Sequence, residues 1–174
     1  MLDAYPNMIS QHGQKESGRR LFLVMTAFSA LCGVSRALAQ GDLDAAVAEI
    51  NRAGGKAHAL VCDVTDAAAV KDAVAQLPRL DVLVNNAGTN IPEPFVNVSE
   101  ANLDHVLNLN IRAMFITAQA AVKKMQEDPQ RKSRGGCVIN ITSQMGHVGA
   151  PTRTVYCMTK HAMEGFTKAL AVEL

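Results

Sequence analysis

Short apolar runs separate longer amphipathic stretches along the chain. Apolar runs at 21–25, 57–62, 80–85 and 137–142 have the length of buried strands. Between and after them, apolar residues recur at helical spacing over 42–54, 65–77, 99–126 and 154–174. Strands that alternate with helices predict an α/β fold, with a doubly wound parallel sheet and helices on both faces.

Polar residues and glycine or proline at the ends of the amphipathic stretches set the expected helix boundaries. Asp42, Asp66 and Ser99 each precede a helical stretch and can accept a hydrogen bond from its free N–H groups. Gly54 ends the first helix, and the second ends before Pro78 because the residue before a proline disfavours helix. One domain of residues 21–174 is expected, preceded by a polar, disordered leader at 1–20.

The segment 19–39 allows two interpretations. Arg19 and Arg20, an apolar run to Val34 and an Ala-x-Ala sequence at 37–39 have the layout of an export signal. The alternative is that the run forms the first strand of the domain. The strand is favoured because the rest of the chain has the character of a cofactor-dependent cytoplasmic enzyme. The run is too short for a membrane span.

Charge and composition exclude several classes of partner. The 174 residues carry a net charge of +1, which favours neither nucleic acid nor a membrane surface as a partner. The four cysteines are far apart and mostly in apolar runs, which predicts buried free thiols and a reducing, cytoplasmic location. The five histidines lack the spacing of metal ligands, so no metal site is predicted.

The candidate catalytic residues lie near the end of the chain. Tyr156 and Lys160 are four residues apart in an expected helix, so both side chains lie on one face. A cation held beside a phenol favours its ionised form, which lets the tyrosine exchange a proton. Ser143 follows the strand at 137–142 and can hydrogen-bond the same substrate oxygen.

Four motifs in order resemble the short-chain dehydrogenase/reductase family. They are Asn85-Asn86-Ala87-Gly88, Asn110, the strand end at 139–143, and Tyr156 with Lys160. The resemblance is good over about 57–174 and poor over 21–56. It implies a Rossmann-like sheet and an NAD(P)-dependent oxidoreductase that transfers hydride between nicotinamide and a secondary alcohol or ketone. The substrate neighbourhood it suggests is a sugar acid, a polyol or a 3-oxoacyl group.

The resemblance also assigns catalytic roles. Ser143 positions the reacting oxygen, and Tyr156 is the general acid or base. Lys160 tunes Tyr156 and bonds the nicotinamide ribose, while Asn110 holds a water that relays protons. Two of these residues also have a purely structural interpretation. Asn110 could be a core amide with its hydrogen bonds satisfied, and Ser143 a strand-end hydroxyl in a turn.

By the same resemblance, NAD or NADP contacts several loops. The implied contacts are Gly33, Asp63, Val64, Asn86, Ala87, Gly88, Ile111, Tyr156 and Lys160. Asp63 would meet the adenine ring with Val64 against it, and Asn85 would brace the sheet. The alternatives are a turn or helix-capping role for Asp63 and an ordinary turn at Gly88.

The chain departs from the family pattern in three places. Of the glycine motif that lets backbone approach the pyrophosphate, only Gly33 is present. The second strand is missing, so no residue indicates NAD or NADP, and the strand at 57–62 either pairs with 21–25 or leaves backbone groups unpaired. The chain stops at Leu174, which predicts an exposed edge at 137–142 and an incomplete fold. A fragment, splice form or damaged copy is therefore expected.

A second hypothesis follows from these losses. The chain would be a catalytically silent family member that acts only by association through its last two long helices, 99–126 and 154–174. In the family these helices form a dimer-making bundle, so a homodimer or homotetramer is expected under either hypothesis.

Overall fold

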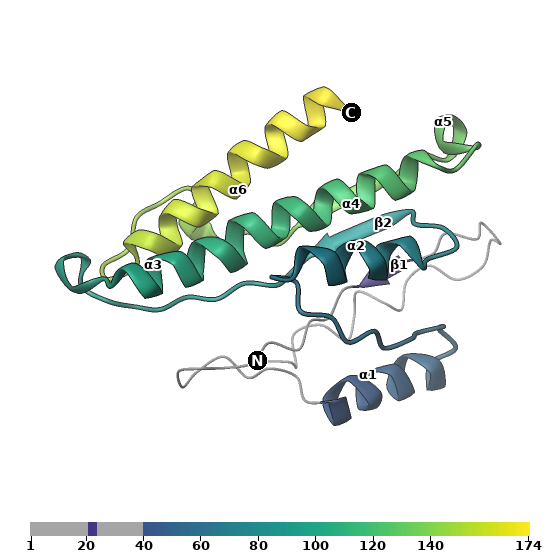
Figure 1. The fold of residues 1–174 in the computed structure, drawn as a ribbon, viewed down its shortest axis with the longest axis horizontal. Coiled ribbons are helices and arrows are strands. Elements are labelled where there is room, and N and C mark those ends of the chain that lie inside the picture. Colours follow the sequence, from purple (N-terminus) through teal and green to yellow (C-terminus); the bar gives the residue numbers. More distant parts are fainter. Residues whose placement is uncertain (1–20, 24–39) are drawn as a thin grey trace.

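The computed structural model of the chain describes residues 21–23 and 40–174, and its centre is a parallel sheet (Figure 1). The three described strands are β1 (Leu21–Leu23), β2 (Val82–Asn85) and β3 (Cys137–Asn140), in the order β1-β2-β3. Both pairs are parallel, and the strands are joined by helical segments. The predicted α/β class is confirmed.

Six α-helices are described, together with three short helical turns. The α-helices are α1 (Gln40–Arg52), α2 (Ala67–Ala75), α3 (Glu100–Leu107), α4 (Met114–Gln126), α5 (Arg131–Arg134) and α6 (Thr154–Glu173). The turns are η1 (Phe95–Asn97), η2 (Asn108–Ala113) and η3 (Gln144–Gly146). Two of the predicted caps are confirmed, because Asp66 accepts from the N–H groups of Ala68 and Ala69, and Ser99 accepts from that of Asn102.

The long helix predicted over 99–126 is interrupted. α3 and α4 follow one another along a common rod in Figure 1, but η2 between them is a π-helical turn. A π turn widens the helix and changes the direction in which its side chains leave the backbone. Such turns are frequent at functional sites. Asn110, one of the predicted catalytic residues, lies inside this turn and is fully buried.

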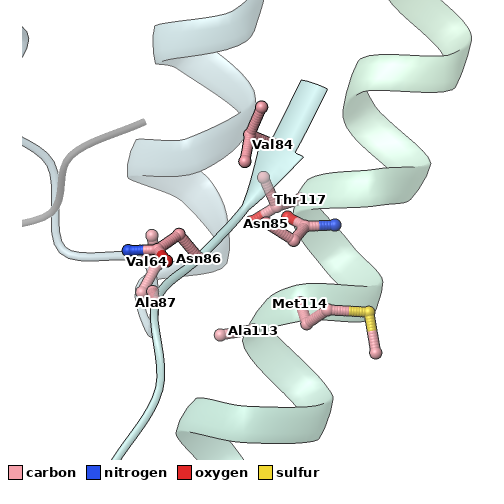
Figure 2. Close-up of a pocket in the computed structure, with 8 residues that line it drawn as sticks. All are labelled: Val64, Val84, Asn85, Asn86, Ala87, Ala113, Met114 and Thr117. Carbon is pink, nitrogen blue, oxygen red and sulfur yellow. The ribbon is translucent and has the colours of Figure 1, made fainter. Parts of the chain in front are cut away.

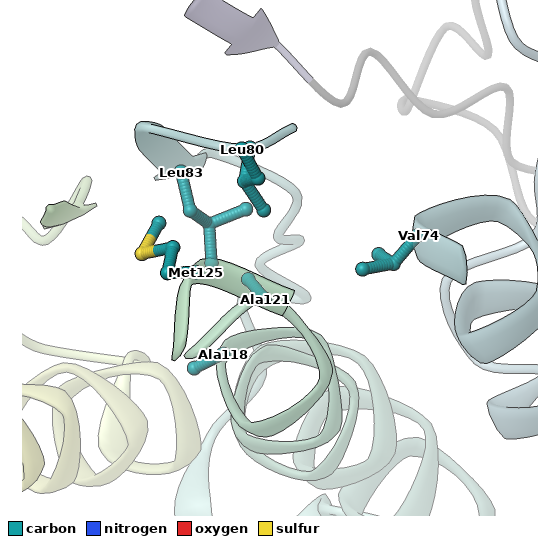
Figure 3. Close-up of a cluster of buried hydrophobic side chains, with 6 residues drawn as sticks. All are labelled: Val74, Leu80, Leu83, Ala118, Ala121 and Met125. Carbon is teal, nitrogen blue, oxygen red and sulfur yellow. The ribbon is translucent and has the colours of Figure 1, made fainter. Parts of the chain in front are cut away.

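The core lies between the sheet and the helices α2 and α4. One cluster joins α2, β2 and α4 (Figure 3), and its buried members are Val74, Leu80, Leu83, Ala118, Ala121 and Met125. A second cluster lies nearer the carboxyl end of β2, with Cys62, Val64, Val70, Leu109 and Ala113. These clusters fix α4 against β2, and with it the π turn.

β3 is the exposed edge that the sequence predicted. Within the described sheet it has β2 as its single neighbour. Its side chains alternate between half-buried and exposed, and Ile139 and Ile141 are 42% and 43% exposed. Cys137, which opens the strand, is also exposed, so the expectation of buried thiols is wrong for this residue and right for Cys62.

The strand predicted over 57–62 is not present. The segment joins no sheet, and Val61 is 57% exposed. Among the described strands β1 pairs with β2 alone, so this segment does not take the open edge of β1. The segment is anchored instead at its start, where Ala57 N–H donates to Asn51 Oδ1 at 2.8 Å.

Several predictions fall on residues outside the described ranges. These are the leader at 1–20 and Gly33 with the remnant of the glycine motif. Of the segment 19–39 only Leu21–Leu23 is described, and it forms β1, as the strand interpretation predicted. In the part of the chain that the structure describes, no helix is long and apolar enough to cross a membrane. Over the same residues, no group of His, Cys, Asp and Glu side chains is arranged to hold a metal ion.

Candidate active site

The carboxyl ends of β2 and β3 lead directly into the motif residues. β2 runs into Asn86–Gly88, and β3 runs into Ser143. The two exits stay together because Ile141 N–H donates to the Asn85 carbonyl at 2.9 Å, just beyond the regular pairing. In an open parallel sheet this edge is where ligands bind.

A line of side-chain hydrogen bonds ties these strand ends to α6. Asn85 Nδ2 donates to Asn140 Oδ1 at 2.9 Å, and Asn140 Nδ2 donates to Thr167 Oγ1 at 2.9 Å. Asn85 is buried, so its amide needs this partner. The bracing role expected for Asn85 is therefore present in the structure.

Lys160 lies at the centre of the site, beside Tyr156. Its Nζ is 5.6 Å from the centroid of the Tyr156 ring and donates to the Ile141 carbonyl at 2.9 Å. The residue is 5% exposed, and burial lowers the pKa of its ammonium below the ordinary value of 10.5. Among the described residues, no carboxylate forms an ion pair with Lys160, so the site holds a poorly compensated buried cation.

This burial predicts a pH-dependent contribution to stability. Because the folded-state pKa of Lys160 is lowered, the desolvation cost is fully present below that pKa. It is relieved as pH rises through that pKa and is gone above 10.5. Lys160→Met removes the titrating group, so the melting temperature of the wild type relative to this variant should rise from neutral pH to about pH 10.

Calorimetry of both proteins across this range checks the expected trend. Lys168→Met, at an exposed lysine of the same helix, is the matched control and should show a flat difference from the wild type. A wild-type advantage over Lys160→Met that stays constant or shrinks with pH would contradict the burial argument.

The side chain of Asn110 is a satisfied core amide. Its Oδ1 accepts from Thr89 N–H at 2.8 Å, and its Nδ2 donates to the Thr89 carbonyl at 2.9 Å and to Thr159 Oγ1 at 3.1 Å. The alternative interpretation of Asn110, a core amide whose hydrogen bonds are satisfied, thus describes its side chain. A water held at this position would have to be bound by main-chain atoms of the π turn.

Gly88 brings the loop after β2 against these residues. A Cβ at this position would lie 3.3 Å from Asn110 Oδ1 and 4.0 Å from Lys160 Nζ. The missing side chain therefore permits the backbone of this loop to lie close to Asn110 and Lys160. Gly88, Asn110, Tyr156 and Lys160 form one neighbourhood, although they come from three separate parts of the chain.

Ser143 begins the turn η3 and is fixed by it. Its Oγ accepts from Met145 N–H at 3.2 Å, which leaves its own proton to donate elsewhere. The turn packs on α6 through Gly146, where an added Cβ would lie 3.1 Å from the Lys160 carbonyl. Ser143 thus belongs to a turn held against the helix that carries Tyr156 and Lys160.

Two further predicted cofactor contacts, Asp63 and Ile111, lie in separate parts of the chain. Asp63 Oδ1 accepts from Thr65 N–H and from Thr65 Oγ1, both at 2.8 Å. Its carboxylate therefore stabilises a turn, which is the alternative role that the sequence allowed for Asp63. Asp63 is exposed. Ile111 is half-buried on the π turn.

A pocket lies at the carboxyl end of β2, between β2 and α4 (Figure 2). Its lining residues are Val64, Val84, Asn85, Asn86, Ala87, Ala113, Met114 and Thr117. None of these described residues is charged, and most are apolar. The volume of the pocket is about 10 Å³, which has room for about one water molecule.

The comparison with known sequences agrees with this arrangement. Residues 25–174 match the sequence pattern of the short chain dehydrogenases. The chain belongs to the short-chain dehydrogenase/reductase family.

Its relatives include enzymes with different names. Cyclopentanol dehydrogenase of Comamonas testosteroni is 42% identical over 133 residues, covering 74% of this chain and 51% of the relative. The 3-oxoacyl-acyl-carrier-protein reductase of Staphylococcus aureus strain N315 is 33% identical over 161 residues, covering 90% and 63%. The crystal structure of acetoin dehydrogenase from Enterobacter cloacae has a TM-score of 0.69 at 32% identity, covering 78% of this chain and 54% of that one. The chain spans about half the length of the cyclopentanol dehydrogenases that it matches.

Sequence reasoning missed the residues that support the site. Thr89 and Thr159 hold Asn110, and Gly146 seats the Ser143 turn, yet none of them was singled out. Thr159 carries a weak signal, since it lies three residues after Tyr156 and one before Lys160. The bonds of Thr89 to Asn110 are made by its backbone, for which a sequence holds no residue-type signal.

Proposed function

We propose that this chain is an NAD(P)-dependent oxidoreductase that transfers a hydride between the nicotinamide and a secondary alcohol or ketone. The observation that carries the proposal is the buried Lys160 ammonium beside the Tyr156 phenol, next to the Gly88 loop. A buried cation without an ion-pair partner costs stability, and it is retained most readily where it serves a reaction.

Tyr156 is the proton-transfer group in this proposal. In the direction of reduction its phenol gives a proton to the carbonyl oxygen, and in oxidation the phenolate takes the proton of the alcohol. Lys160 stabilises the phenolate because its charge is screened little in a buried site. Ser143, whose Oγ already accepts from Met145, donates its own proton to the same substrate oxygen.

The bound nicotinamide would supply or accept the hydride. This chain's residues would hold it at the carboxyl edge of the sheet. The Asn86–Gly88 backbone and Lys160 would bind ribose hydroxyls, Val64 and Ile111 would pack on the rings, and Asp63 would meet the adenine. Gly33 would approach the pyrophosphate, and the π turn at Asn110 would hold the water that connects Lys160 to solvent.

The residues of the chain identify the substrate less closely than they identify the reaction. The relatives named above are a cyclopentanol dehydrogenase, a 3-oxoacyl reductase and an acetoin dehydrogenase. We propose a secondary alcohol or its ketone as the substrate class. The first compounds to screen are alicyclic, 3-oxoacyl, polyol and sugar-acid compounds. NAD and NADP are both to be tested as cofactors.

Binding of NADH and NADPH to the purified chain tests the proposal. At about 100 times the dissociation constant, a ligand specific for the folded state adds about 2.7 kcal/mol to stability, which a thermal shift resolves. Saturable stabilisation by one nucleotide is expected, with loss of the effect in Lys160→Met. A folded sample that binds neither nucleotide would overturn the enzyme assignment.

The same sample decides the second candidate, a silent family member that acts by association. Phe115 of α4 is 49% exposed and packs against Phe166 of α6, with ring centroids 5.6 Å apart. This leaves apolar surface on both long helices, as a homodimer or homotetramer would require. Sedimentation showing a dimer that binds neither nucleotide would favour this candidate.

A further inference from the structure

Thr152, just before α6, has a strained backbone. Its φ is 58°, and among the described residues other than glycine it alone has a positive φ. A value in this region raises the backbone energy of a residue with a branched Cβ. The side chain is exposed, so side-chain packing does not impose this conformation. The strain therefore needs another cause.

The residues around Thr152 form a tight turn. Arg153 N–H donates to the Ala150 carbonyl at 3.3 Å, with Pro151 and Thr152 between them. Proline in the second place and a positive φ in the third are the pattern of a type II turn, whose third place favours glycine or asparagine. Thr152 Oγ1 donates to the Pro151 carbonyl at 2.7 Å, which is a bond within the turn.

The backbone of Thr152 joins this turn to a loop from a distant part of the chain. Its carbonyl accepts from Glu93 N–H at 2.9 Å. Glu93 lies between β2 and η1, and its Oε1 accepts from Asn102 Nδ2 of α3 at 2.9 Å. The same loop is held at its start, where the Thr89 backbone bonds the Asn110 side chain. The turn is thus fixed against an anchored loop, at the end of the molecule where α3 and α6 begin (Figure 1).

The first turn of α6 lacks a side-chain cap. Arg153 is in the cap position and its side chain makes no capping hydrogen bond, whereas Asp66 and Ser99 cap α2 and α3. Tyr156 is the third residue of α6 and so belongs to this uncapped turn. The position of its phenol therefore depends on how the backbone enters the helix, and the hydrogen bond from Glu93 fixes that entry.

We infer that Thr152 is a positioning residue for the proposed reaction. Its left-handed backbone directs its carbonyl to Glu93 N–H, and this bond sets where α6 begins and thereby where the Tyr156 phenol lies. The inference rests on the proposed function, which gives no role to Thr152 or Glu93. Strain is retained in such a place because a small displacement of a reacting group lowers the rate greatly.

Tyrosine fluorescence tests the inference without any cofactor. The chain has two tyrosines and no tryptophan, so Tyr5→Phe leaves Tyr156 as the single tyrosine. Acrylamide quenching then reports how freely the first turn of α6 opens to solvent.

Two substitutions at Glu93 are compared in this background. Glu93→Pro removes the N–H that donates to Thr152, and the position before Pro94 already favours the extended backbone that proline adopts. Glu93→Ala is the matched control, because both variants lose the side-chain bond to Asn102 but alanine keeps the N–H. Quenching of Tyr156 should be stronger in the proline variant, since a helix end without its anchor opens more often.

Steady-state kinetics give a second readout. The kcat of Glu93→Pro should be about 10- to 100-fold below that of Glu93→Ala, because the general acid is misplaced. The KM for the nicotinamide cofactor should agree within about twofold between the two. A purely structural loop would lower the melting temperature and leave the kcat of the folded protein unchanged.

Substitutions at Thr152 keep the inference testable if Glu93→Pro does not fold. Thr152→Asn adopts a positive φ more readily, so it should raise the melting temperature by about 2–4 °C and leave Tyr156 quenching as in the wild type. Thr152→Gly also permits a positive φ but frees the backbone to take other conformations, so quenching should be stronger than in the asparagine variant.

Two results would overturn the inference. The first is equal quenching in the folded Glu93→Pro and Glu93→Ala proteins or, if the proline variant does not fold, in Thr152→Gly and Thr152→Asn. This result leaves the proposed function intact as long as NADH or NADPH binds the wild type. The second is failure of the wild type to bind either nucleotide, which removes the reaction and with it the role of Thr152, whatever the quenching shows.

Discussion

Replacing Tyr156 by Phe is expected to lower kcat by about 10²- to 10⁴-fold, the usual contribution of a positioned acid or base. The substitution removes the phenolic oxygen and keeps the ring that lies 5.6 Å from Lys160 Nζ. NADH affinity should stay within about twofold, because the loss concerns a group that acts in the transition state. Steady-state kinetics with a ketone identified by screening, together with NADH titration, measures both quantities.

A neighbouring substitution controls for damage to the helix. Met158 lies on α6 between Tyr156 and Lys160 and is 47% exposed, so Met158→Leu should change kcat little. Retention of most of the wild-type kcat by Tyr156→Phe would remove the tyrosine from the mechanism. Parallel loss of NADH binding and kcat would instead indicate a structural effect of the ring.

Gly146→Ala is expected to destabilise the fold by about 1–3 kcal/mol, the range for overpacking a filled site. A Cβ at Gly146 would lie 2.9 Å from Thr142 Oγ1, 3.0 Å from Glu164 Cγ and 3.1 Å from the Lys160 carbonyl. The last of these is backbone, so the turn that begins at Ser143 must move away from α6. Catalytic activity should therefore fall together with stability.

A second glycine in the same region gives a control of opposite sign. Gly165 lies inside α6, and an added Cβ there would have no neighbour within 4 Å. Gly165→Ala should stabilise the helix by about 0.5–1 kcal/mol, because alanine loses less backbone entropy on folding. Chemical denaturation of both variants measures the difference. Equal effects at the two glycines would show that the turn is not seated on α6 as described.

The elements that sequence reasoning placed well are those with local causes. Ser99 and Asp66 cap helices through hydrogen bonds two or three residues along the chain, so residue type and order suffice to find them. The strand at 57–62 failed for the opposite reason. Its apolar residues fit a strand, but a strand also needs a paired neighbour, and this segment pairs with no described strand.

In the site, too, the features with local causes are predictable from the sequence and the long-range contacts are not. The proximity of Tyr156 and Lys160 follows from helix geometry and is present in the structure. The bonds that Asn110 makes to Thr89 span 21 residues, and its bond to Thr159 spans 49, so no local pattern reveals them. The π turn interrupts the regular helical spacing predicted over 99–126, so that spacing does not reveal it.

The amide pair between β2 and β3 has a consequence for how the chain folds. Asn85 and Asn140 are directly opposite in the parallel register, and the buried Asn85 amide donates to Asn140 Oδ1. A slip of one residue would place Ile139 or Ile141 against Asn85 and turn the Asn140 amide to the wrong side of the sheet. Parallel pairing between distant segments forms slowly and offers many misaligned encounters. The Asn85–Asn140 bond therefore forms only in the native register, so it favours this strand alignment over a pairing that is shifted by one residue.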